Sequence, residues 1–597
     1  MLKTNLLGGE KSLKQLNINE LNSLANEVRG VIINAVSENG GHLSSNLGAV
    51  ELTLALHYVF DFSKDKLIFD VGHQSYTHKI VTDRLDKILT IRKGDGISGF
   101  PDHNESDFDA VSVGHAGTSI SASLGYAYAR DTKNDDYYVI AVVGDASLLN
   151  GENLEALTSS DKKPKKFIVI LNDNGMSISK NNNGLYKFIS KVTTSKRYTK
   201  FNAFLSRTVG NCFIGKFLKW IKNSIKRLFN ANNFIDNLGL KYAGVFDGHD
   251  IKSLISLLSQ IKETEQPTLL HLKTVKGKGL EQAEQDSTKF HGVSKNMQTS
   301  VNDFSNSVSS SLENVLEVRN DIVAITAGMC DGVGLKSFSE NHPDKFVDVG
   351  IQEEFAVTYA SGVAKGGVKP YVFIYSTFMQ RSYDQIVHDV CLQKLPVVMC
   401  LDRAGLVGSD GKTHQGVFDL SYLRHIPNLT VLAPKDVNEF NKMLVSVANY
   451  DMPVAIRYPN GVVNEIPSTN EFSLDFSWET LKTGGNTVIY ACGSRMVDLA
   501  NKVYNETNGN VTVVNARVVK PLDVNTIKKY LNYNVITLED NVKQGGFGEA
   551  VLSTLTQFGF NGKFKQFGVD DEFIEHNTVN NQMIKNGLTV EKIIETI

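Results

Sequence analysis

Two oxygen-bearing side chains follow two neighbouring apolar runs and could together bind a metal ion. Asp145 offers a carboxylate and Asn174 an amide oxygen. Both are hard donors that suit magnesium better than zinc or copper. A magnesium ion held by only two or three protein oxygens keeps open coordination positions, which phosphate oxygens fill well. The alternative is that Asp145 and Asn174 only cap a helix and a turn.

Two short apolar runs would place these side chains. The runs at 138–143 and 167–171 are rich in β-branched residues and bounded by turn residues, which is typical of buried parallel strands. Residues 148–159 between them can form a helix, so the expected unit is strand, helix, strand. Both polar clusters then lie at the carboxyl ends of neighbouring strands, where open α/β sheets bind ligands.

Two histidines occur in glycine-rich contexts at the ends of further expected elements. His42 precedes an expected helix at 49–59, and His73 follows an expected strand at 66–71. A single histidine of this kind is more easily explained as a capping or structural residue. Two of them in glycine contexts indicate a polar pocket.

Two other segments of the N-terminal half could approach a ligand closely. Gly114 and His115 precede a small-residue helix expected at 120–130, and small residues let a backbone or a ligand come near. Lys276 lies in a Lys-Gly-Lys-Gly turn after an expected strand at 268–274. It could contact a phosphate, although exposed lysine turns are common.

Length and composition bound the class of protein. The 597 residues predict several domains, with three the expected number. A hydrophobic content of 41%, a charged content of 21% and a net charge of −3 are those of an ordinary soluble protein, and they give no electrostatic reason to expect nucleic-acid or membrane partners. The five cysteines form no CxxC pair, so neither a metal cage nor a disulfide framework is expected. Because no signal peptide or membrane span is evident, we expect a cytoplasmic protein.

Two segments differ in character from their surroundings. Residues 187–233 are rich in Lys, Arg, Ser and Asn, and 213–229 have the pattern of a basic amphipathic helix. We interpret this segment as a mobile excursion of its own domain; the alternative is a helix that binds a membrane surface or a partner. Near 296–310 the chain becomes rich in Ser and Asn, which predicts a linker.

A second α/β series follows the expected linker. Its expected strands are 322–326, 346–349, 371–375, 397–401 and 430–432. Arg403 follows the fourth of them, Arg457 follows a later strand, and a glycine-flanked loop holds Asp410 and His414. Arginines are suited to binding a substrate phosphate, although a single arginine is more often part of a surface ion pair.

A third series begins after about residue 483. Its expected strands are 487–491, 511–515 and 535–538. It contains no evident grouping of acid, base and phosphate-binding residues, so we expect a structural and dimer-forming role.

Together these motifs resemble the 1-deoxy-D-xylulose-5-phosphate synthase family of thiamine diphosphate enzymes, which is related to transketolase. The resemblance covers essentially the whole chain and rests on motifs such as GGHLSSNLG, DVGHQSYTHKI, LNDNGMSIS, KGKG, YSTFMQRSYDQ and DRAGLVGSDGKTHQG. It implies a homodimer of three transketolase-like α/β domains with mainly parallel sheets, at 1–297, 312–465 and 483–597, with the active site between the first two. The implied activity is the decarboxylative condensation of pyruvate with D-glyceraldehyde 3-phosphate, which feeds isoprenoid, thiamine and pyridoxal synthesis.

The resemblance also implies that the chain binds magnesium and thiamine diphosphate. Asp145, Asn174 and the backbone oxygen of Met176 are similar to the metal ligands. Glu353 is similar to the glutamate that hydrogen-bonds the aminopyrimidine and favours the tautomer that activates the thiazolium carbon. Phe378 resembles the aromatic residue that stacks on the pyrimidine. The other implied cofactor contacts are His73, Gly114, His115, Ala116, Ala146, Ser147, Lys276 and Leu280.

The remaining matched positions would bind substrate or move protons. The matching pocket histidines are His42, His73, His291 and His414. The matching substrate-binding residues are Tyr375, Arg381, Arg403, Asp410, His414 and Arg457. Of these, Arg403 and Arg457 are the expected clamps on the substrate phosphate.

Three positions depart from the family pattern. Ala146 stands where glycine is usual, Leu280 where tyrosine is usual, and Glu354-Phe355 where Gln-His is usual. None of these departures removes an expected metal ligand or Glu353. They bear on acceptor choice, rate and cofactor affinity. The main alternative is therefore a paralogous transketolase or acyloin synthase with another donor or acceptor, and the second is a pseudoenzyme that only binds the cofactor.

Overall fold

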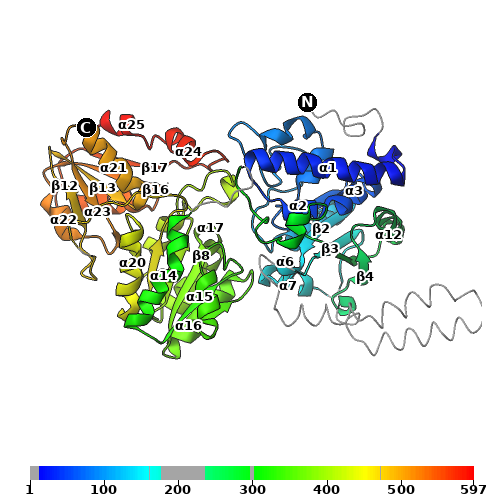
Figure 1. Ribbon diagram of the computed structural model, residues 1–597, viewed down its shortest axis with the longest axis horizontal. Helices are drawn as coiled ribbons and strands as arrows, with labels where there is room; N and C mark the ends of the chain where they lie inside the picture. The colour runs from blue at the N-terminus through cyan, green and yellow to red at the C-terminus, as the bar shows by residue number, and fades with distance from the viewer. Residues whose placement is uncertain (1–11, 161, 176–234, 296–301, 471) are drawn as a thin grey trace, which may run out of the picture. The chain divides into compact units, whose positions relative to one another are not determined.

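The computed structural model describes residues 12–160, 162–175, 235–295, 302–470 and 472–597 (Figure 1). They belong to two units, of which unit 1 comprises 1–91 and 96–299, and unit 2 comprises 92–95 and 300–597. The expected mobile segment at 187–233, with its basic helix, and Met176 lie outside the described residues.

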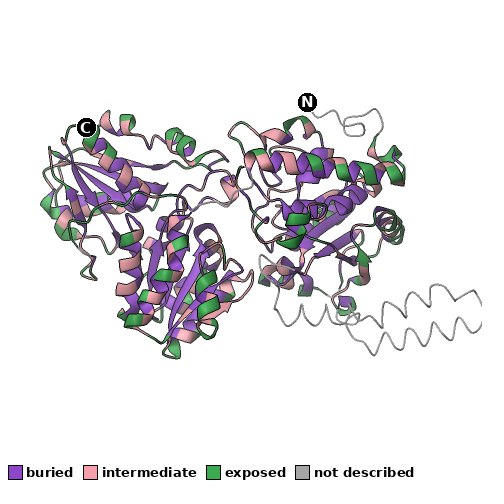
Figure 2. Ribbon diagram, viewed as in Figure 1, coloured by how far each residue is buried: buried purple, intermediate pink, exposed green. Residues whose placement is uncertain are grey.

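Unit 1 is built on a five-stranded sheet in which every pair of neighbouring strands is parallel. In spatial order its strands are β1 (Lys66–Phe69), β2 (Val139–Gly144), β3 (Phe167–Asp173), β5 (Thr268–Lys273) and β4 (Lys241–Asp247). The inner strands β2 and β3 are buried along almost their whole length, as expected for a parallel sheet covered on both faces. Figure 2 shows buried strands inside and exposed residues on the outer helix faces.

Helices cover the sheet of unit 1. The longest helix among the described residues of unit 1, α1 (Ile18–Asn39), is capped by Asn17, whose side chain accepts hydrogen bonds from two backbone nitrogens of the first turn. Helix α1 packs on α3 (Val50–Val59), α3 packs on α12 (Ile251–Thr264), and α5 (Ser119–Lys133) packs on β2. The shorter helices are α2 (Ser44–Leu47), α4 (Tyr76–Val81), α6 (Asp145–Leu148), α7 (Gly151–Thr158), α13 (Glu281–Gln285), η1 (Leu13–Gln15) and η2 (Leu85–Thr90).

Unit 2 contains a seven-stranded sheet that is parallel except for one edge strand. In spatial order its strands are β15 (Val518–Lys520), β10 (Thr430–Leu432), β11 (Val454–Arg457), β9 (Val398–Asp402), β8 (Lys369–Tyr375), β6 (Ile322–Thr326) and β7 (Phe346–Asp348). The associated helices are α14 (Asp303–Val318), α15 (Lys336–Asn341), α16 (Glu353–Lys365), α17 (Ser376–Met379), α18 (Tyr383–Gln385), α19 (Asp419–Arg424), α20 (Val437–Ser446), η4 (Pro343–Lys345), η5 (Gln380–Ser382), η6 (Ile386–Cys391), η7 (Gly411–Thr413) and η8 (Val447–Asn449).

A second sheet of unit 2 has five strands and is parallel except for the pairing of β12 with β14. In spatial order its strands are β12 (Glu479–Lys482), β14 (Thr512–Asn515), β13 (Thr487–Cys492), β16 (Asn534–Val542) and β17 (Phe564–Val569). Its helices are α21 (Ser494–Glu506), α22 (Val524–Lys529), α23 (Phe547–Gln557), α24 (Val579–Lys585) and α25 (Val590–Ile594). Because β15 leaves this part of the chain to pair with β10, the two sheets of unit 2 share one apolar core.

The three sheets confirm the predicted fold class of α/β domains with mainly parallel sheets. The linker prediction for 296–310 is wrong from residue 303 onward, because α14 begins there. Phe304, Val308 and Leu312 are fully buried and recur every four residues, so they form the apolar stripe of a helix whose other faces are Ser and Asn.

Two smaller differences concern the strand–helix–strand unit and β4. The helix expected at 148–159 is α7, which begins at Gly151 because Asn150 caps it by accepting a hydrogen bond from the backbone nitrogen of Glu152; the short helix α6 precedes it. Strand β4 was not predicted; its residues are mostly half-buried or exposed and so lack a continuous apolar run. Among the described residues, no helix is long and apolar enough to cross a membrane.

Candidate active site

The parallel strands of unit 1 bring Asp145 and Asn174 to one edge of the sheet. Strands β2 and β3 pair in register, with Gly144 opposite Asn172. Asp145 begins α6 directly after β2, and Asn174 follows the last residue of β3. The two predicted oxygen donors therefore lie at adjacent strand ends.

The Asp145 carboxylate has the properties expected of a cation ligand. It is only 3% exposed, and its Oδ2 atom has no hydrogen-bond partner among the described residues. Burial and the negative charge of Asp173 raise the pKa of Asp145 to about 7. A cation beside this oxygen would offset both effects, because an opposite charge stabilises the carboxylate. One carboxylate with a neighbouring amide oxygen thus fits a hard divalent ion such as Mg²⁺.

Three histidines from distant parts of the sequence form one cluster in unit 1. The ring centroids of His42, His73 and His291 lie 5.2 to 5.5 Å apart, each pair edge to face. Burial, with the charges of Lys276 and the other two rings, lowers the pKa of His291 well below its ordinary value. His291 is therefore neutral at neutral pH and can accept a hydrogen bond through one ring nitrogen.

The charge of Lys276 acts on both the histidine cluster and Asp145, since it lowers the pKa of His291 and opposes the rise in the pKa of Asp145. Burial lowers the pKa of Lys276 itself to about 8, and the Asp145 carboxylate opposes that shift. A buried lysine beside a buried carboxylate offers one group for an anion and one for a cation.

The turn before α5 is held by Asp70, a residue that the sequence analysis did not single out. Asp70 follows β1 and accepts hydrogen bonds from the backbone nitrogens of Gly117 and Ser119 at 2.9 and 3.1 Å. These bonds place the predicted cofactor residues at 114–116 near the adjacent carboxyl ends of β1 and β2. The position of an acidic residue after a strand was the only sequence signal for Asp70.

In unit 2, Glu353 is the first residue of α16 and is only 3% exposed. Arg381 donates a hydrogen bond from Nη1 to Glu353 Oε2 at 3.4 Å. Burial raises the pKa of Glu353 to about 7, an effect that the charge of Arg381 partly offsets. The carboxyl therefore titrates in the neutral range, where a group can both hold and release a proton.

Four further predicted residues cluster around an aromatic stack in unit 2. The ring of Phe378 stacks on that of Tyr375, with centroids 5.5 Å apart and planes 14° apart. His414 meets Phe378 edge to face at 5.6 Å, and burial lowers the pKa of His414. The Arg403 guanidinium lies 3.8 Å from the Tyr375 ring centroid and also pairs with Asp402. The structure thus brings together residues that are up to 39 positions apart in the sequence.

Asp410 is engaged by Arg92, which the sequence analysis missed. Arg92 Nη1 donates to the Asp410 carboxylate, and Nη2 donates to Ser409 Oγ at 2.7 Å. A lone arginine more than 300 residues away carries no local sequence signal for this contact.

The environment of Arg457 differs from that of an open phosphate clamp. Its side chain is buried, and it donates to Asp419 at 3.1 and 3.2 Å and to Asp540 at 2.6 Å. These carboxylates raise the pKa of Arg457 further above its ordinary value despite its burial. Its role in binding a substrate phosphate stays a prediction.

Three family models match consecutive parts of the chain. The model described as 1-deoxy-D-xylulose-5-phosphate synthase matches residues 5–274. The transketolase pyrimidine-binding domain matches 302–465, and the transketolase C-terminal domain matches 477–593. A solved transketolase structure from Campylobacter jejuni is similar over 97% of this chain and 99% of that chain, at 18% identity and a TM-score of 0.43.

Curated relatives match over nearly the full length. The 1-deoxy-D-xylulose-5-phosphate synthase of Clostridium acetobutylicum is 44% identical over 586 residues, which cover 95% of this chain and 94% of the relative. That of Clostridium tetani is 43% identical and covers 98% and 97% of the two chains. This chain belongs to the 1-deoxy-D-xylulose-5-phosphate synthase family. The family and enzyme class predicted from the motifs are thereby confirmed.

The structure accounts for two of the departures from the synthase family pattern. Leu280 precedes α13 and packs on the apolar core of unit 1, so it serves as a core side chain. Phe355 is 51% exposed on α16, with its ring 5.7 Å from that of Tyr359. Ala146 lies in α6 between the buried Asp145 and Ser147 and is itself half-buried.

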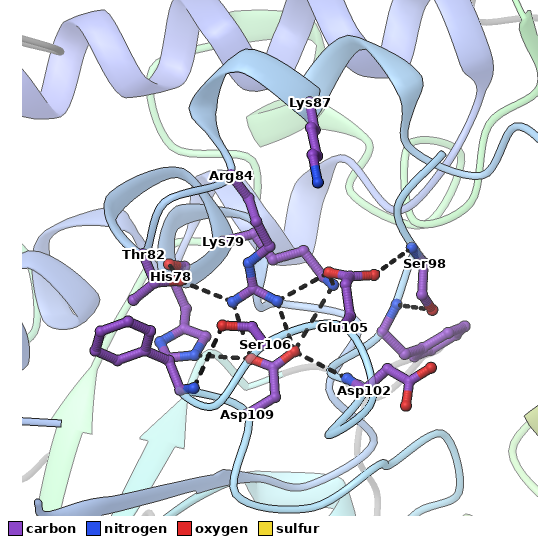
Figure 3. Close-up of polar contacts among 12 residues, drawn as sticks. His78, Lys79, Thr82, Arg84, Lys87, Ser98, Asp102, Glu105, Ser106 and Asp109 are labelled. Atoms are coloured by element: carbon purple, nitrogen blue, oxygen red, sulfur yellow. Dashed lines mark hydrogen bonds and ion pairs between the residues drawn. The ribbon is translucent and has the colours of Figure 1, made fainter. Parts of the chain in front are cut away.

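This member of the synthase family also contains a buried ionic cluster that no motif indicated (Figure 3). Arg84 donates to Glu105 at 2.8 Å and to Asp109 at 2.6 and 2.9 Å, and Lys79 pairs with Glu105. His78 contacts Asp109 at 3.0 Å. The two carboxylates also accept the backbone nitrogens of residues 98 and 102, at 2.7 and 2.9 Å. The cluster therefore anchors the backbone of the loop at residues 98 and 102, which is a structural role.

Proposed function

We propose that this chain condenses pyruvate with D-glyceraldehyde 3-phosphate to give 1-deoxy-D-xylulose 5-phosphate and CO₂. The observation that carries this proposal is the similarity to synthases of that name over 95% or more of the chain. The residues of each unit support it, since Asp145 and Asn174 in unit 1 and Glu353 in unit 2 are present at strand or helix ends. A transketolase or acyloin synthase with other substrates is not favoured, because curated relatives that match nearly the full length of this chain carry the synthase name.

We propose that the cofactor is thiamine diphosphate held through Mg²⁺. Asp145 and Asn174 would supply side-chain oxygens to the ion, and the backbone oxygen of Met176 is the third proposed ligand. Lys276 would contact the diphosphate, along with the turn at 114–116 and residues Ala146 and Ser147. When bound, the cofactor supplies a nucleophilic carbon and an electron sink for loss of CO₂.

Glu353 is the proposed proton carrier at the aminopyrimidine. Because its pKa is raised to about 7, its protonated form is populated at neutral pH and can donate a hydrogen bond to a ring nitrogen. Phe378, which already stacks on Tyr375, offers the flat apolar surface on which the pyrimidine would rest.

The histidine cluster and the arginines are the proposed substrate-binding groups. His291 has a strongly lowered pKa and is neutral, so it can accept a hydrogen bond from the donor substrate. Arg403, which lies beside the ring of Tyr375, and Arg457 are the proposed clamps on the acceptor phosphate, and Arg381 is a further proposed substrate-binding residue. Asp410 and His414 would contact the acceptor hydroxyl groups.

We propose that the protein is a homodimer. Large apolar side chains are exposed on α16 and on the segment after η6: Phe355 by 51%, Tyr359 by 38% and Leu392 by 67%. Helix α16 also packs on η6, so these side chains lie on neighbouring elements. Exposed apolar groups gathered in this way are typical of a protein–protein interface. Sedimentation analysis should show a dimer for the wild type and a larger monomer fraction for Phe355→Glu.

The decisive experiment supplies the purified protein with Mg²⁺, thiamine diphosphate and pyruvate, with and without D-glyceraldehyde 3-phosphate. The product is identified by mass spectrometry. We expect 1-deoxy-D-xylulose 5-phosphate only in the complete mixture, and loss of product when the metal is chelated. Efficient turnover with a different acceptor and none with glyceraldehyde 3-phosphate would overturn the proposal.

A further inference from the structure

A chain of buried polar side chains lies next to the turn that carries Asn174. Asp173, the last residue of β3, accepts from His271 Nε2 at 2.9 Å through its Oδ2 atom. The other ring nitrogen, His271 Nδ1, lies 2.8 Å from the hydroxyl of Tyr242. Lys273 donates to Asp173 Oδ1 at 3.1 Å. Three strands, β3, β5 and β4, therefore contribute to one hydrogen-bonded chain.

The side chains of this hydrogen-bonded network are closely packed. Asp173 is 2% exposed and His271 is fully buried. The rings of Tyr242 and His271 also meet edge to face, with centroids 6.0 Å apart. On the neighbouring strand β4, Gly244 leaves the room that His271 needs, since a Cβ there would lie 2.6 Å from the Cβ of His271. The His271 imidazole is thus held between the ring of Tyr242, the carboxylate of Asp173 and the backbone of β4 at Gly244.

The chemistry of the groups sets the direction of the hydrogen bond between His271 and Asp173. An ionised carboxylate only accepts hydrogen bonds, so His271 Nε2 must donate to Asp173. The other ring nitrogen, Nδ1, and the Tyr242 hydroxyl form the second hydrogen bond of the imidazole. Both ring nitrogens of His271 and both oxygens of Asp173 have a hydrogen-bond partner, which fixes the orientation of the ring and of the carboxylate.

The same carboxylate also holds the backbone of the turn. Asp173 Oδ1 accepts the backbone nitrogen of Gly175 at 2.9 Å, directly after Asn174. On the other side, Thr274 donates from Oγ1 to Asn172 Oδ1 at 2.6 Å and from its backbone nitrogen to the carbonyl of Asp173 at 2.9 Å. The residues on both sides of Asn174 are therefore fastened to β5 and to its continuation.

We propose that Tyr242, His271 and Asp173 are positioning residues that hold the turn at 172–175 in the geometry that binds the divalent ion. They touch neither the ion nor the substrate; they act through Asn174. This inference rests on the proposed magnesium–thiamine diphosphate site and adds the residues that preorganise it. Outer partners of metal ligands commonly change metal affinity by about 10- to 100-fold when they are mutated.

The test measures Mg²⁺-dependent binding of thiamine diphosphate to the full-length protein by isothermal titration calorimetry. For Asp173→Asn and His271→Gln we expect apparent Mg²⁺ affinity to fall about 10- to 100-fold. Tyr242→Phe removes a single half-buried oxygen and should lower it less, because the His271–Asp173 contact remains. In activity assays, the Mg²⁺ concentration needed for half-maximal rate should rise while kcat at saturating Mg²⁺ changes little.

His78→Gln is the matched control, because it disrupts another buried contact between a histidine and an aspartate of unit 1 (Figure 3). His78 is 1% exposed and contacts Asp109, whose carboxylate holds the backbone of residue 102 and not the turn at 172–175. The His78→Gln variant should lower thermal stability to an extent similar to His271→Gln but leave the Mg²⁺ affinity unchanged.

Equal Mg²⁺ affinity in the wild type, Asp173→Asn and Tyr242→Phe would overturn the inference even if His271→Gln failed to fold. An equal loss of affinity in His78→Gln would also overturn it, because the effect would then reflect general destabilisation. If the wild type itself bound no thiamine diphosphate with Mg²⁺, the proposed function would fail first, and the inference with it.

Discussion

At the scale of single residues, the burial of Glu353 makes its protonation state sensitive to pH near neutrality. The side chain lies at the start of α16 with Arg381 as its charged partner, and its pKa is raised to about 7. A carboxyl in water would be almost fully ionised there and could not donate a proton. The raised pKa is therefore the physical reason to regard Glu353 as a proton carrier.

Replacing Glu353 by Gln should lower kcat by about 100- to 10,000-fold, because a positioned acid or base contributes that much. The amide keeps the size of the side chain but cannot exchange a proton. Steady-state assays with pyruvate and glyceraldehyde 3-phosphate measure the loss, and circular dichroism checks that the fold is retained. Near-wild-type kcat in this variant would contradict the assignment.

The same substitution should also change how the free energy of unfolding depends on pH in the absence of cofactor. Because the pKa of Glu353 is raised in the folded state to about 7 from an ordinary 4.5, the folded wild type binds an extra proton between these values and loses stability as the pH rises through them. The Glu353→Gln variant lacks this loss. Its unfolding free energy relative to wild type should therefore increase by about 2–4 kcal/mol from pH 4.5 to pH 7.5. Urea denaturation across this range measures the difference, and a constant difference would show that Glu353 has an ordinary pKa.

At the scale of elements, α14 shows that the Ser- and Asn-rich stretch after the first domain is part of the core. Phe304 is fully buried and contacts the rings of Phe440 and Tyr458. Phe304→Ala should destabilise the protein by about 3–5 kcal/mol, the usual cost of removing a buried aromatic ring. Ser310→Ala, at an exposed position of the same helix, should change stability by less than about 0.5 kcal/mol. Thermal denaturation distinguishes these outcomes, and equal effects of the two substitutions would indicate a linker.

The turn before α5 depends on the backbone freedom of a single glycine. Gly117 has a φ of +94°, and a Cβ there would lie 2.2 Å from Asn150 Oδ1. Gly117→Ala should lower stability and weaken cofactor binding, since it displaces the turn that Asp70 holds. Gly125→Ala is the matched control, because this exposed glycine lies inside α5 with no atom within 4 Å of its added Cβ, and the change should stabilise by about 0.5–1 kcal/mol. Thermal shift with and without thiamine diphosphate measures both effects.

At the scale of the whole molecule, Arg457 ties the two sheets of unit 2 together. It ends β11 of the seven-stranded sheet, while its partner Asp540 belongs to β16 of the five-stranded sheet. Arg457→Met should cost about 3–5 kcal/mol, because it removes the charged partner of the buried Asp419 and leaves Asp540 with Arg495 alone. The double variant Arg457→Met with Asp540→Asn should recover part of that loss. Calorimetry measures the stability of these variants. The KM for glyceraldehyde 3-phosphate shows whether Arg457 also binds the phosphate. A raised KM at unchanged stability would indicate that Arg457 binds the phosphate and does not hold the sheets together.

Most elements of the fold could be predicted from the sequence because their signals are local. A short β-branched run bounded by turn residues predicts a buried strand wherever it lies, and β6 and β10 begin and end at the predicted residues. The predicted placement of Asp145 and Asn174 followed from the same rule, since polar residues after parallel strands meet at one edge of the sheet. The failure at α14 has a local cause as well, because composition concealed an apolar stripe of period four.

The amino-acid sequence by itself determined the layers of the fold, the family, and which residues are proposed to bind the cofactor. Only the tertiary structure decided how those residues are supported: that Asp173 is bound to His271, 98 positions away, and Arg457 to Asp540, 83 positions away. Such contacts depend on which strands become neighbours and on how water is excluded from between them. Neither property is encoded in the spacing of residues along the chain, so burial and the pKa shifts that follow from it emerge only in the folded protein.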